Sequence, residues 1–239
     1  MEVVNYLLGY NNLKIYQNSN MFNFSLDSVL LPNFVTINSK IKQVLDIGCG
    51  NAPISLILTT KTKAHITGVE IQEKVYKLAQ KSVEINNLNH QITLINDDIN
   101  NLVDKWESDF FDIIVCNPPF FKVNNKSRLN ESDYKTIARH EITLNVEKLM
   151  EISRKLLKNN GVVAIVHRPE RMIEIIQVMR KNNIEPKKIQ LVYPKIGETA
   201  NIILIEGRKN GNEGLTILPP IITHNKNGKY TEIIKNFFE

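Results

Sequence analysis

Cysteine is scarce in this chain of 239 residues, which has only Cys49 and Cys116. Two thiols cannot build a disulfide framework, and by themselves they cannot supply a zinc site, so we expect no metal. Long apolar runs are also missing, because no stretch approaches the ~18 residues that span a bilayer. The first ten residues lack a basic segment ahead of an apolar one, which argues against a secretory signal. We therefore expect a cytoplasmic protein with no membrane partner.

Internal repeats, low-complexity tracts and clear linkers are absent too, so the length predicts a single domain over residues 1–239. The net charge is only +5, which permits a nucleic-acid partner without requiring one. The charge is unevenly distributed, however. Residues 1–118 hold 9 basic and 12 acidic residues, a net charge of −3, whereas residues 119–239 hold 21 and 13, a net charge of +8. This asymmetry predicts a cationic face in the second half, with salt-dependent binding to phosphates.

Short β-branched segments alternate with amphipathic segments through most of the chain. The expected strands are 43–47, 65–70, 92–97, 112–117, 162–167, 189–193 and 201–206. The expected helices are 72–86, 144–157 and 170–181, with Asn159-Asn160-Gly161 as a helix stop. The alternation predicts an α/β fold with a seven-stranded, mostly parallel sheet and helices on both faces. The last two strands have no helix between them, so we expect an antiparallel hairpin at one edge.

A glycine turn follows the first expected strand, in the sequence Asp46-Ile47-Gly48-Cys49-Gly50. Its two glycines allow a tight turn and a close approach of backbone to a ligand. Glu70 ends the second strand, 20 residues after Gly50, where a carboxylate can accept hydrogen bonds from both hydroxyls of a ribose. Asp97 and Asp98 end the third strand, where a carboxylate can accept from the amine of an adenine. Doubly wound sheets bind their ligands at these carboxyl ends of strands.

The turn reads D-x-G-x-G and not G-x-G-x-x-G, which separates two kinds of nucleotide cofactor. An acid before the turn is unfavourable beside the pyrophosphate of a nicotinamide cofactor, but it suits the sulfonium and amino group of S-adenosyl-L-methionine (AdoMet). We therefore predict AdoMet as the cofactor. Cys49 in the turn and Ile71 after the strand-end acid are counted among the residues that bind it.

The tetrapeptide Asn117-Pro118-Pro119-Phe120 follows the fourth strand and is the expected catalytic segment. Consecutive prolines fix φ at two positions and force Asn117 into an extended conformation, which makes a rigid turn with exposed carbonyls. Asn117 also lies beside the expected cofactor and adds a side-chain acceptor. Two fixed acceptors can hold an –NH2 group, and Phe120 can stack on a planar base, a contact worth about 1–3 kcal/mol.

The exocyclic N6 of adenine is a poor nucleophile because its lone pair is delocalised into the ring. Acceptors on both N–H bonds draw the nitrogen toward a tetrahedral, nucleophilic form, so the reaction is above all a problem of positioning. It needs no strong general base, but the base must be unstacked to enter the pocket.

Residues 121–141 form a polar segment for which two interpretations stay open: an RNA-facing loop that orders on binding, or a solvated insertion. On the first interpretation, the substrate-binding residues are Phe120, Phe121, Lys122, Lys126, Arg128, Arg139 and His140.

D-x-G-x-G, the strand-end Glu70 and N-P-P-F, in this order, resemble class I AdoMet-dependent amino-group methyltransferases with a Rossmann-like fold. Flanking blocks narrow the resemblance to the bacterial tRNA1(Val) adenine(37)-N6-methyltransferase family: 24–31 (FSLDSVLL), 138–141 (ARHE), 198–201 (ETAN), 204–207 (LIEG) and 218–220 (LPP). One departure is Asn51-Ala52-Pro53, where related enzymes often carry Ser/Thr-Gly.

The resemblance implies tRNA as the partner and residue roles at the matching positions. Asp46, Gly48, Gly50, Glu70 and Asp98 would contact AdoMet, and Asp27 would close over it as part of an N-terminal cap, 1–40. Asn117, Pro118 and Phe120 would hold the adenine, and 207–239 would be a C-terminal extension. A monomer or weak dimer is expected.

Alternatives are methylation of rRNA guanine N2 or of protein glutamine by the same N-P-P-F chemistry. A non-enzymatic module that senses AdoMet or binds RNA is disfavoured, because pure binding does not need two aimed carbonyls.

Overall fold

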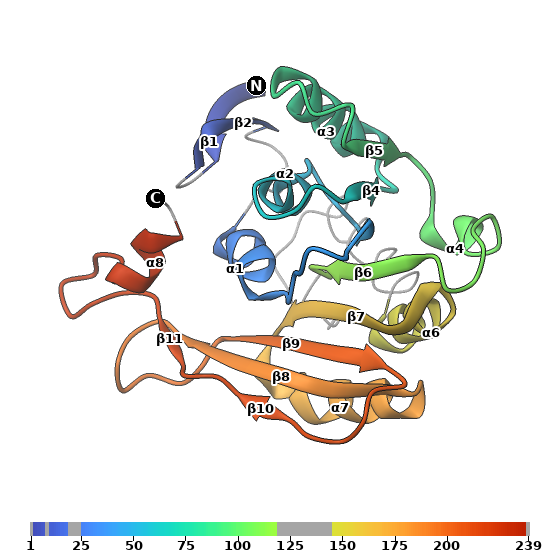
Figure 1. The fold of residues 1–239 in the computed structure, drawn as a ribbon. Coiled ribbons are helices and arrows are strands. Elements are labelled where there is room, and N and C mark those ends of the chain that lie inside the picture. Colours follow the sequence, from blue (N-terminus) through green and yellow to red (C-terminus); the bar gives the residue numbers. More distant parts are fainter. Residues whose placement is uncertain (1, 8–9, 19–24, 119–144, 238–239) are drawn as a thin grey trace, which may run out of the picture.

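The computed structural model describes residues 2–7, 10–18, 25–118 and 145–237, and the structural statements below concern these residues. A nine-stranded mixed sheet lies at the centre, in the order β10-β8-β9-β7-β6-β3-β4-β5, with β11 also paired to β8 (Figure 1). Its strands are β3 (Gln43–Ile47), β4 (His65–Val69), β5 (Ile92–Ile95), β6 (Phe111–Cys116), β7 (Leu157–His167), β8 (Ile184–Tyr193), β9 (Ile202–Lys209), β10 (Thr216–Ile217) and β11 (Ile221–Ile222).

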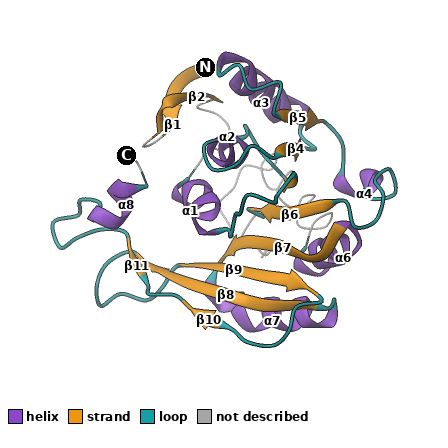
Figure 2. Cartoon of the chain, in the orientation of Figure 1, coloured by secondary structure: helices purple, strands orange, loops and turns teal. Residues whose placement is uncertain are grey.

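The seven expected strands are all present, and the predicted antiparallel pairing of the last two is confirmed. β9 runs antiparallel to both β7 and β8, whereas β3, β4, β5, β6 and β7 pair in parallel. Accordingly, β6 points toward the side of the molecule that holds α1, and β9 points the opposite way (Figure 2). The expected count of seven is wrong, because β10 and β11 add to β8 in parallel and cover the predicted edge. Each is only two residues long, too short to show a period, and Pro219-Pro220 separates them.

Helices cover both faces of the sheet, as predicted. They are α1 (Leu26–Phe34), α2 (Pro53–Thr59), α3 (Glu73–Ile85), α4 (Ile99–Leu102), α6 (Val146–Leu156), α7 (Met172–Lys181) after a short 3-10 turn η1 (Pro169–Arg171), and α8 (Glu232–Asn236). Within the described residues, no helix has the length and apolar character needed to cross a membrane.

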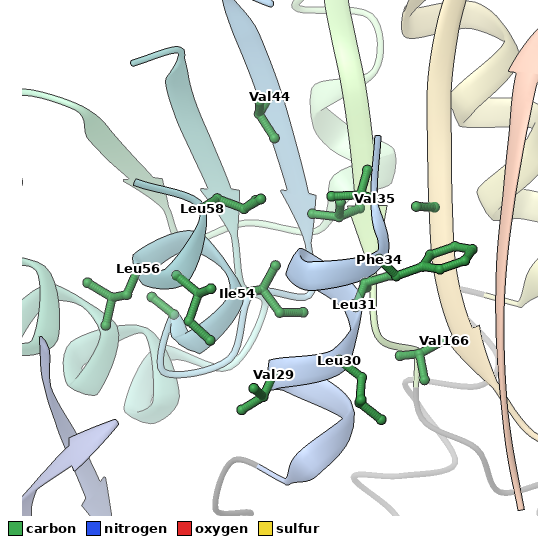
Figure 3. Close-up of a cluster of buried hydrophobic side chains, with 14 of the residues drawn as sticks. Val29, Leu30, Leu31, Phe34, Val35, Val44, Ile54, Leu56, Leu58 and Val166 are labelled. Atoms are coloured by element: carbon green, nitrogen blue, oxygen red, sulfur yellow. The ribbon is translucent and has the colours of Figure 1, made fainter. Parts of the chain in front are cut away.

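Two apolar cores lie on opposite faces of the sheet, because neighbouring strand residues point to opposite sides. Val44 belongs to the core that α1, α2 and α3 cover, whereas Leu45 belongs to the core that α4, α6 and α7 cover. Figure 3 shows part of the first core, in which α1 lies beside α2; the buried apolar side chains of α1 labelled there are Val29, Leu30, Leu31 and Phe34. α1 is thereby fixed against the strands whose ends form the candidate site.

The predicted helix stop at Asn159-Asn160-Gly161 is wrong in position. α6 ends at Leu156, and Leu157 already pairs with Phe111 as the first residue of β7. Asn160 has a left-handed φ of +62°, and the pairing of β7 with β6 shifts between Phe111 and Ile113. The segment is therefore an irregularity inside a strand.

An N-terminal hairpin of β1 (Glu2–Leu7) and β2 (Tyr10–Asn18), which we did not predict, packs against α3. The backbone of Lys14 exchanges two hydrogen bonds with the side-chain amide of Asn86, at 2.9 and 2.6 Å. The N–H of Tyr16 donates to the Ser82 hydroxyl (2.9 Å), and its carbonyl accepts from Asn51 Nδ2 (2.7 Å). Side chains, and not a further strand, therefore satisfy this edge of β2.

Candidate active site

The carboxyl ends of three adjacent strands bring the expected site residues together. Ile47 of β3 pairs with Val69 of β4 on one side and with Cys116 of β6 on the other. The residues that follow these three strands therefore begin from the same level of the sheet. They are Gly48, Glu70 and Asn117, which confirms that the sheet gathers the two motifs at one edge.

The glycine turn wraps over the end of β4. The N–H groups of Gly48 and Cys49 both donate to the carbonyl of Val69, at 2.9 and 3.0 Å. Gly48 and Gly50 have φ values of +69° and +59°, a region that disfavours side chains. A Cβ added to either glycine would meet nothing within 4 Å, so open space borders the backbone here. Such a surface can receive a ligand in close contact.

Glu70 is buried and braces this turn. Its Oε2 accepts the N–H of Gly50 at 3.0 Å, and its Oε1 accepts the N–H of Gln72 at 2.8 Å. Because a carboxylate oxygen can accept more than one hydrogen bond, this arrangement leaves capacity for the hydroxyls of a ligand. The neighbouring Ile71 is 40% exposed and can cover an apolar part of the same ligand.

Asp46 is fully buried beneath the turn with one carboxylate oxygen unsatisfied. Its Oδ2 accepts from the Ser55 hydroxyl at 2.6 Å, but its Oδ1 has no hydrogen-bond partner among the described residues. Burial raises the pKa of Asp46 to about 7, although the hydrogen bonds from Ser55 oppose the rise. A buried carboxylate with an unused oxygen suits a positively charged ligand group.

Asp97 and Asp98 are not at the end of a strand, because β5 stops at Ile95. Asp98 caps α4 by accepting the N–H of Asn100 at 2.9 Å. Asp97 accepts from Asn101 at 2.8 Å, and this bond helps to hold its pKa below the ordinary value. The two carboxylates are thus drawn into the start of α4, while Asn96 ties the loop to the carbonyl of Glu70 at 2.7 Å.

α1 meets the end of β6 at the same edge. Asn117 Nδ2 lies 3.5 Å from the hydroxyl of Ser28, and Pro118 is buried. Asp27 is buried and accepts from the Ser25 hydroxyl at 3.1 Å. Burial raises the pKa of Asp27, while Ser25 and the Arg168 guanidinium oppose the rise.

Several predicted residues lie outside the described residues: Pro119, Phe120, Phe121, Lys122, Lys126, Arg128, Arg139 and His140.

The end of β7 adds two residues that sequence reasoning missed. His167 is buried, its Nδ1 accepts the N–H of Arg168 at 2.7 Å, and burial together with Arg171 lowers its pKa to about 4. Arg168 donates to the carbonyl of Asn201 at 2.9 Å. A His-Arg pair at the end of a buried strand was the available signal, since neighbouring parallel strands end at this edge.

The arrangement can hold a small cationic, hydroxyl-bearing ligand at the ends of β3 and β4, beside the polar side chain of Asn117 that follows β6. Neither nearby thiol offers a nucleophile, because burial raises the pKa of Cys49 and Cys116 well above the ordinary value.

Comparisons with known proteins agree with this geometry. Residues 38–234 match the family model described as a methyltransferase domain. The chain is 27% identical to a protein of Flavobacterium psychrophilum named tRNA1(Val) (adenine(37)-N6)-methyltransferase, over 86% of this chain and 87% of that protein. A protein of Shewanella baltica with the same name is 25% identical over 89% and 90% of the two chains.

Solved structures share the fold at low sequence identity. A predicted O-methyltransferase from Agrobacterium tumefaciens superposes with a TM-score of 0.70 at 19% identity, covering 89% of this chain and 95% of that one. TYW2 of M. jannaschii in complex with AdoMet gives a TM-score of 0.57 at 14% identity, covering 87% and 85%.

Proposed function

Because the chain belongs to the methyltransferase domain family, we propose that it transfers a methyl group from AdoMet to the N6 nitrogen of an adenine in tRNA. The target that the named relatives support is adenine 37 of tRNA1(Val). The observation that carries the proposal is that Asn117, which follows β6, lies at the same sheet edge as the Gly48–Gly50 turn, which follows the neighbouring strand β3.

The residues of the turn fit the cofactor. Asp46 Oδ1, which no described residue bonds, suits a cationic group; the open space at Gly48 and Gly50 admits a ligand against backbone, and the fixed carboxylate of Glu70 suits ribose hydroxyls. Bound AdoMet supplies a methyl group on a sulfonium centre. We propose the same cofactor contacts for Asp27, Cys49, Ile71, Asp97 and Asp98, as the sequence predicts.

Asn117 holds the target amine in this proposal. Its Nδ2 faces Ser28, and its Oδ1 accepts no hydrogen bond from the described residues, so this oxygen is available to an N–H of the adenine. The backbone carbonyls of the Asn117–Pro119 segment would supply the second acceptor, and Phe120 the stacking surface. The neutral His167 is consistent with a reaction that needs orientation more than a strong base.

We also propose roles for the remaining segments of the chain, as the sequence predicts. The polar segment 121–141 would contact the RNA, 1–40 would cap the cofactor, and 207–239 would extend the domain. The enzyme would act in the cytoplasm as a monomer or weak dimer without a metal. Over the part of the chain that the structure describes, no cluster of three or more His, Cys, Asp or Glu could hold a metal ion.

Incubation with methyl-labelled AdoMet and a tRNA1(Val) transcript, followed by nucleoside mass spectrometry, tests the proposal. We expect N6-methyladenosine, and none when adenine 37 is replaced by guanine. The Asn117→Ala protein is the matched enzyme control and should give no product. Label in guanine N2 or in protein glutamine, with none in adenine, would refute the proposed substrate.

A further inference from the structure

Two turns beyond β7 lie at the same edge of the sheet as the candidate active site. β7 and β8 both run antiparallel to β9, so β8 is parallel to β7 and ends at this edge. Residues 194–200 follow β8 and lead into β9. Arg168, which follows β7, bonds the carbonyl of Asn201 at 2.9 Å and so joins this turn to the strand next to Asn117.

The second turn, residues 224–230, is fastened to the first. The N–H of His224 donates to the carbonyl of Pro194 at 2.9 Å, and the N–H of Thr223 donates to Tyr193 at 2.9 Å. Asn225 Oδ1 accepts the N–H of Lys229 at 3.1 Å and closes the turn. The rings of His224 and Tyr230 lie 4.8 Å apart across its base, at an angle of 32°.

The two turns display three exposed lysines, Lys195, Lys226 and Lys229, which we call the lysine rim. None of the three forms an ion pair or a side-chain hydrogen bond with a described residue. A pocket of about 240 Å³ lies between the turns, lined by Lys195, Ile196, Glu198, His224 and Lys226. Glu198 is the one acid in the lining, so the rim keeps a surplus of positive charge.

A larger groove of about 740 Å³ between the N-terminal hairpin and α3 also carries lysines, but two of them are already paired with carboxylates. There Lys77 pairs with Glu73 at 2.6 Å, and Lys81 pairs with Glu2 at 2.5 Å. A polyanion would have to displace those carboxylates before it could bind Lys77 or Lys81. The backbone that carries the lysine rim is already fixed by hydrogen bonds, so binding of a polyanion there costs less conformational entropy.

We propose that the lysine rim binds phosphates of the RNA strand outside the target nucleotide, an inference that rests on the proposed function. A base must leave its stack to reach Asn117, so the flanking backbone has to be held beside the site. Lysines serve as point charges for phosphates at such a surface. Ile196, which is 76% exposed between the lysines, adds apolar contact for a sugar or base.

Replacing the three rim lysines by Gln tests the inference through the salt dependence of tRNA binding, measured by fluorescence anisotropy. The matched control replaces three exposed lysines that precede β3 and β4 at the opposite edge, Lys40, Lys42 and Lys63. Three lost phosphate contacts reduce the slope of log K against log salt by about 2 to 3. The wild-type and control proteins should therefore lose about 16- to 64-fold more affinity than the rim variant between 50 and 200 mM salt.

An unchanged slope in the rim variant, or a reduced slope in the control, would overturn the inference. Methylation of the tRNA transcript by the wild-type protein is measured in parallel. If that product forms while the rim variant binds like wild type, the rim is wrong and the proposed function stands. If no N6-methyladenosine forms but tRNA binding still depends on the rim, the proposed function fails and the rim is retained.

Discussion

We predict that the affinity for AdoMet depends on pH, because the buried carboxyl of Asp46 must release its proton before it can pair with a cationic group of the cofactor. With a pKa of about 7 in the protein without ligand, this carboxyl is charged in about one molecule in eleven at pH 6 and in about ten in eleven at pH 8. If a cationic group of AdoMet pairs with the carboxylate, only the charged form binds well. Kd should then fall about tenfold from pH 6 to pH 8, or about 1.4 kcal/mol.

Isothermal titration calorimetry in two buffers of different ionisation enthalpy measures both quantities. We expect release of about 0.9 proton per AdoMet at pH 6 and about 0.1 at pH 8 from Asp46. The α-amino group of AdoMet can titrate in the same range, so the Asp46→Asn protein supplies the correction. The Asp46→Asn protein should bind AdoMet more weakly, and the remaining pH dependence of its Kd should come only from titration of the cofactor. Equal pH dependence in the two proteins would refute the pairing.

The same group makes a prediction for stability without ligand. Its folded-state pKa lies above the ordinary value of 3.8, so the native state retains a proton that the unfolded chain releases between pH 3.8 and about 7. The free energy of unfolding therefore falls by up to about 1.4 kcal/mol per pH unit as pH rises through this window, about 4 kcal/mol in all. Urea denaturation at pH 5.5 and 7 should show the decrease in the wild type and a smaller one in Asp46→Asn.

Three further substitutions separate catalysis, cofactor binding and stability. Asn117→Ala should abolish methyl transfer while AdoMet affinity stays within a few fold, and full activity would exclude its role in holding the amine. Glu70→Ala leaves the N–H of Gly50 without its acceptor, so AdoMet affinity should fall and unfolding should become easier by about 1–3 kcal/mol; an unchanged calorimetric Kd would exclude the cofactor contact. Glu206→Ala removes the buried partner of the partly exposed Lys188, at 3.1 Å, and should cost up to about 3 kcal/mol in urea denaturation, partly restored by Lys188→Met in the same chain.

The parallel part of the fold was predictable because its strands are buried on both faces and read as continuous β-branched runs. β6 (FDIIVC) and the centre of β7 (VVAIV) show this pattern, and the rule that ligands bind at carboxyl ends of parallel strands then located Asp46, Glu70 and Asn117. The use of Asp98 as a cap was not predictable, since it depends on where β5 stops.

The position of the N-terminal hairpin could not be predicted from the sequence, because it depends on side-chain contacts between residues far apart in the chain. β2 alternates Leu13 and Ile15 with polar residues, yet its place is set by Asn86 and Ser82, some 70 residues away in sequence. Asn51, which stands where related enzymes often carry Ser or Thr, also has a structural role. Its side-chain amide donates a hydrogen bond to the carbonyl of Tyr16 and so connects the glycine turn to β2. A local pattern shows that such a strand can form, but not which surface it will join.

The side-chain bonds along β2 also bear on self-association. An uncovered strand edge is a template on which another chain can add a strand, which is a common route to aggregation. On β2 the peptide groups of Lys14 and Tyr16 are already occupied by three side chains that cannot propagate a ladder. The hairpin sheet therefore stops at two strands, because the side chains of Asn86, Ser82 and Asn51 occupy the hydrogen-bonding groups at its edge. Substitution of these residues would expose an edge that another chain could pair with.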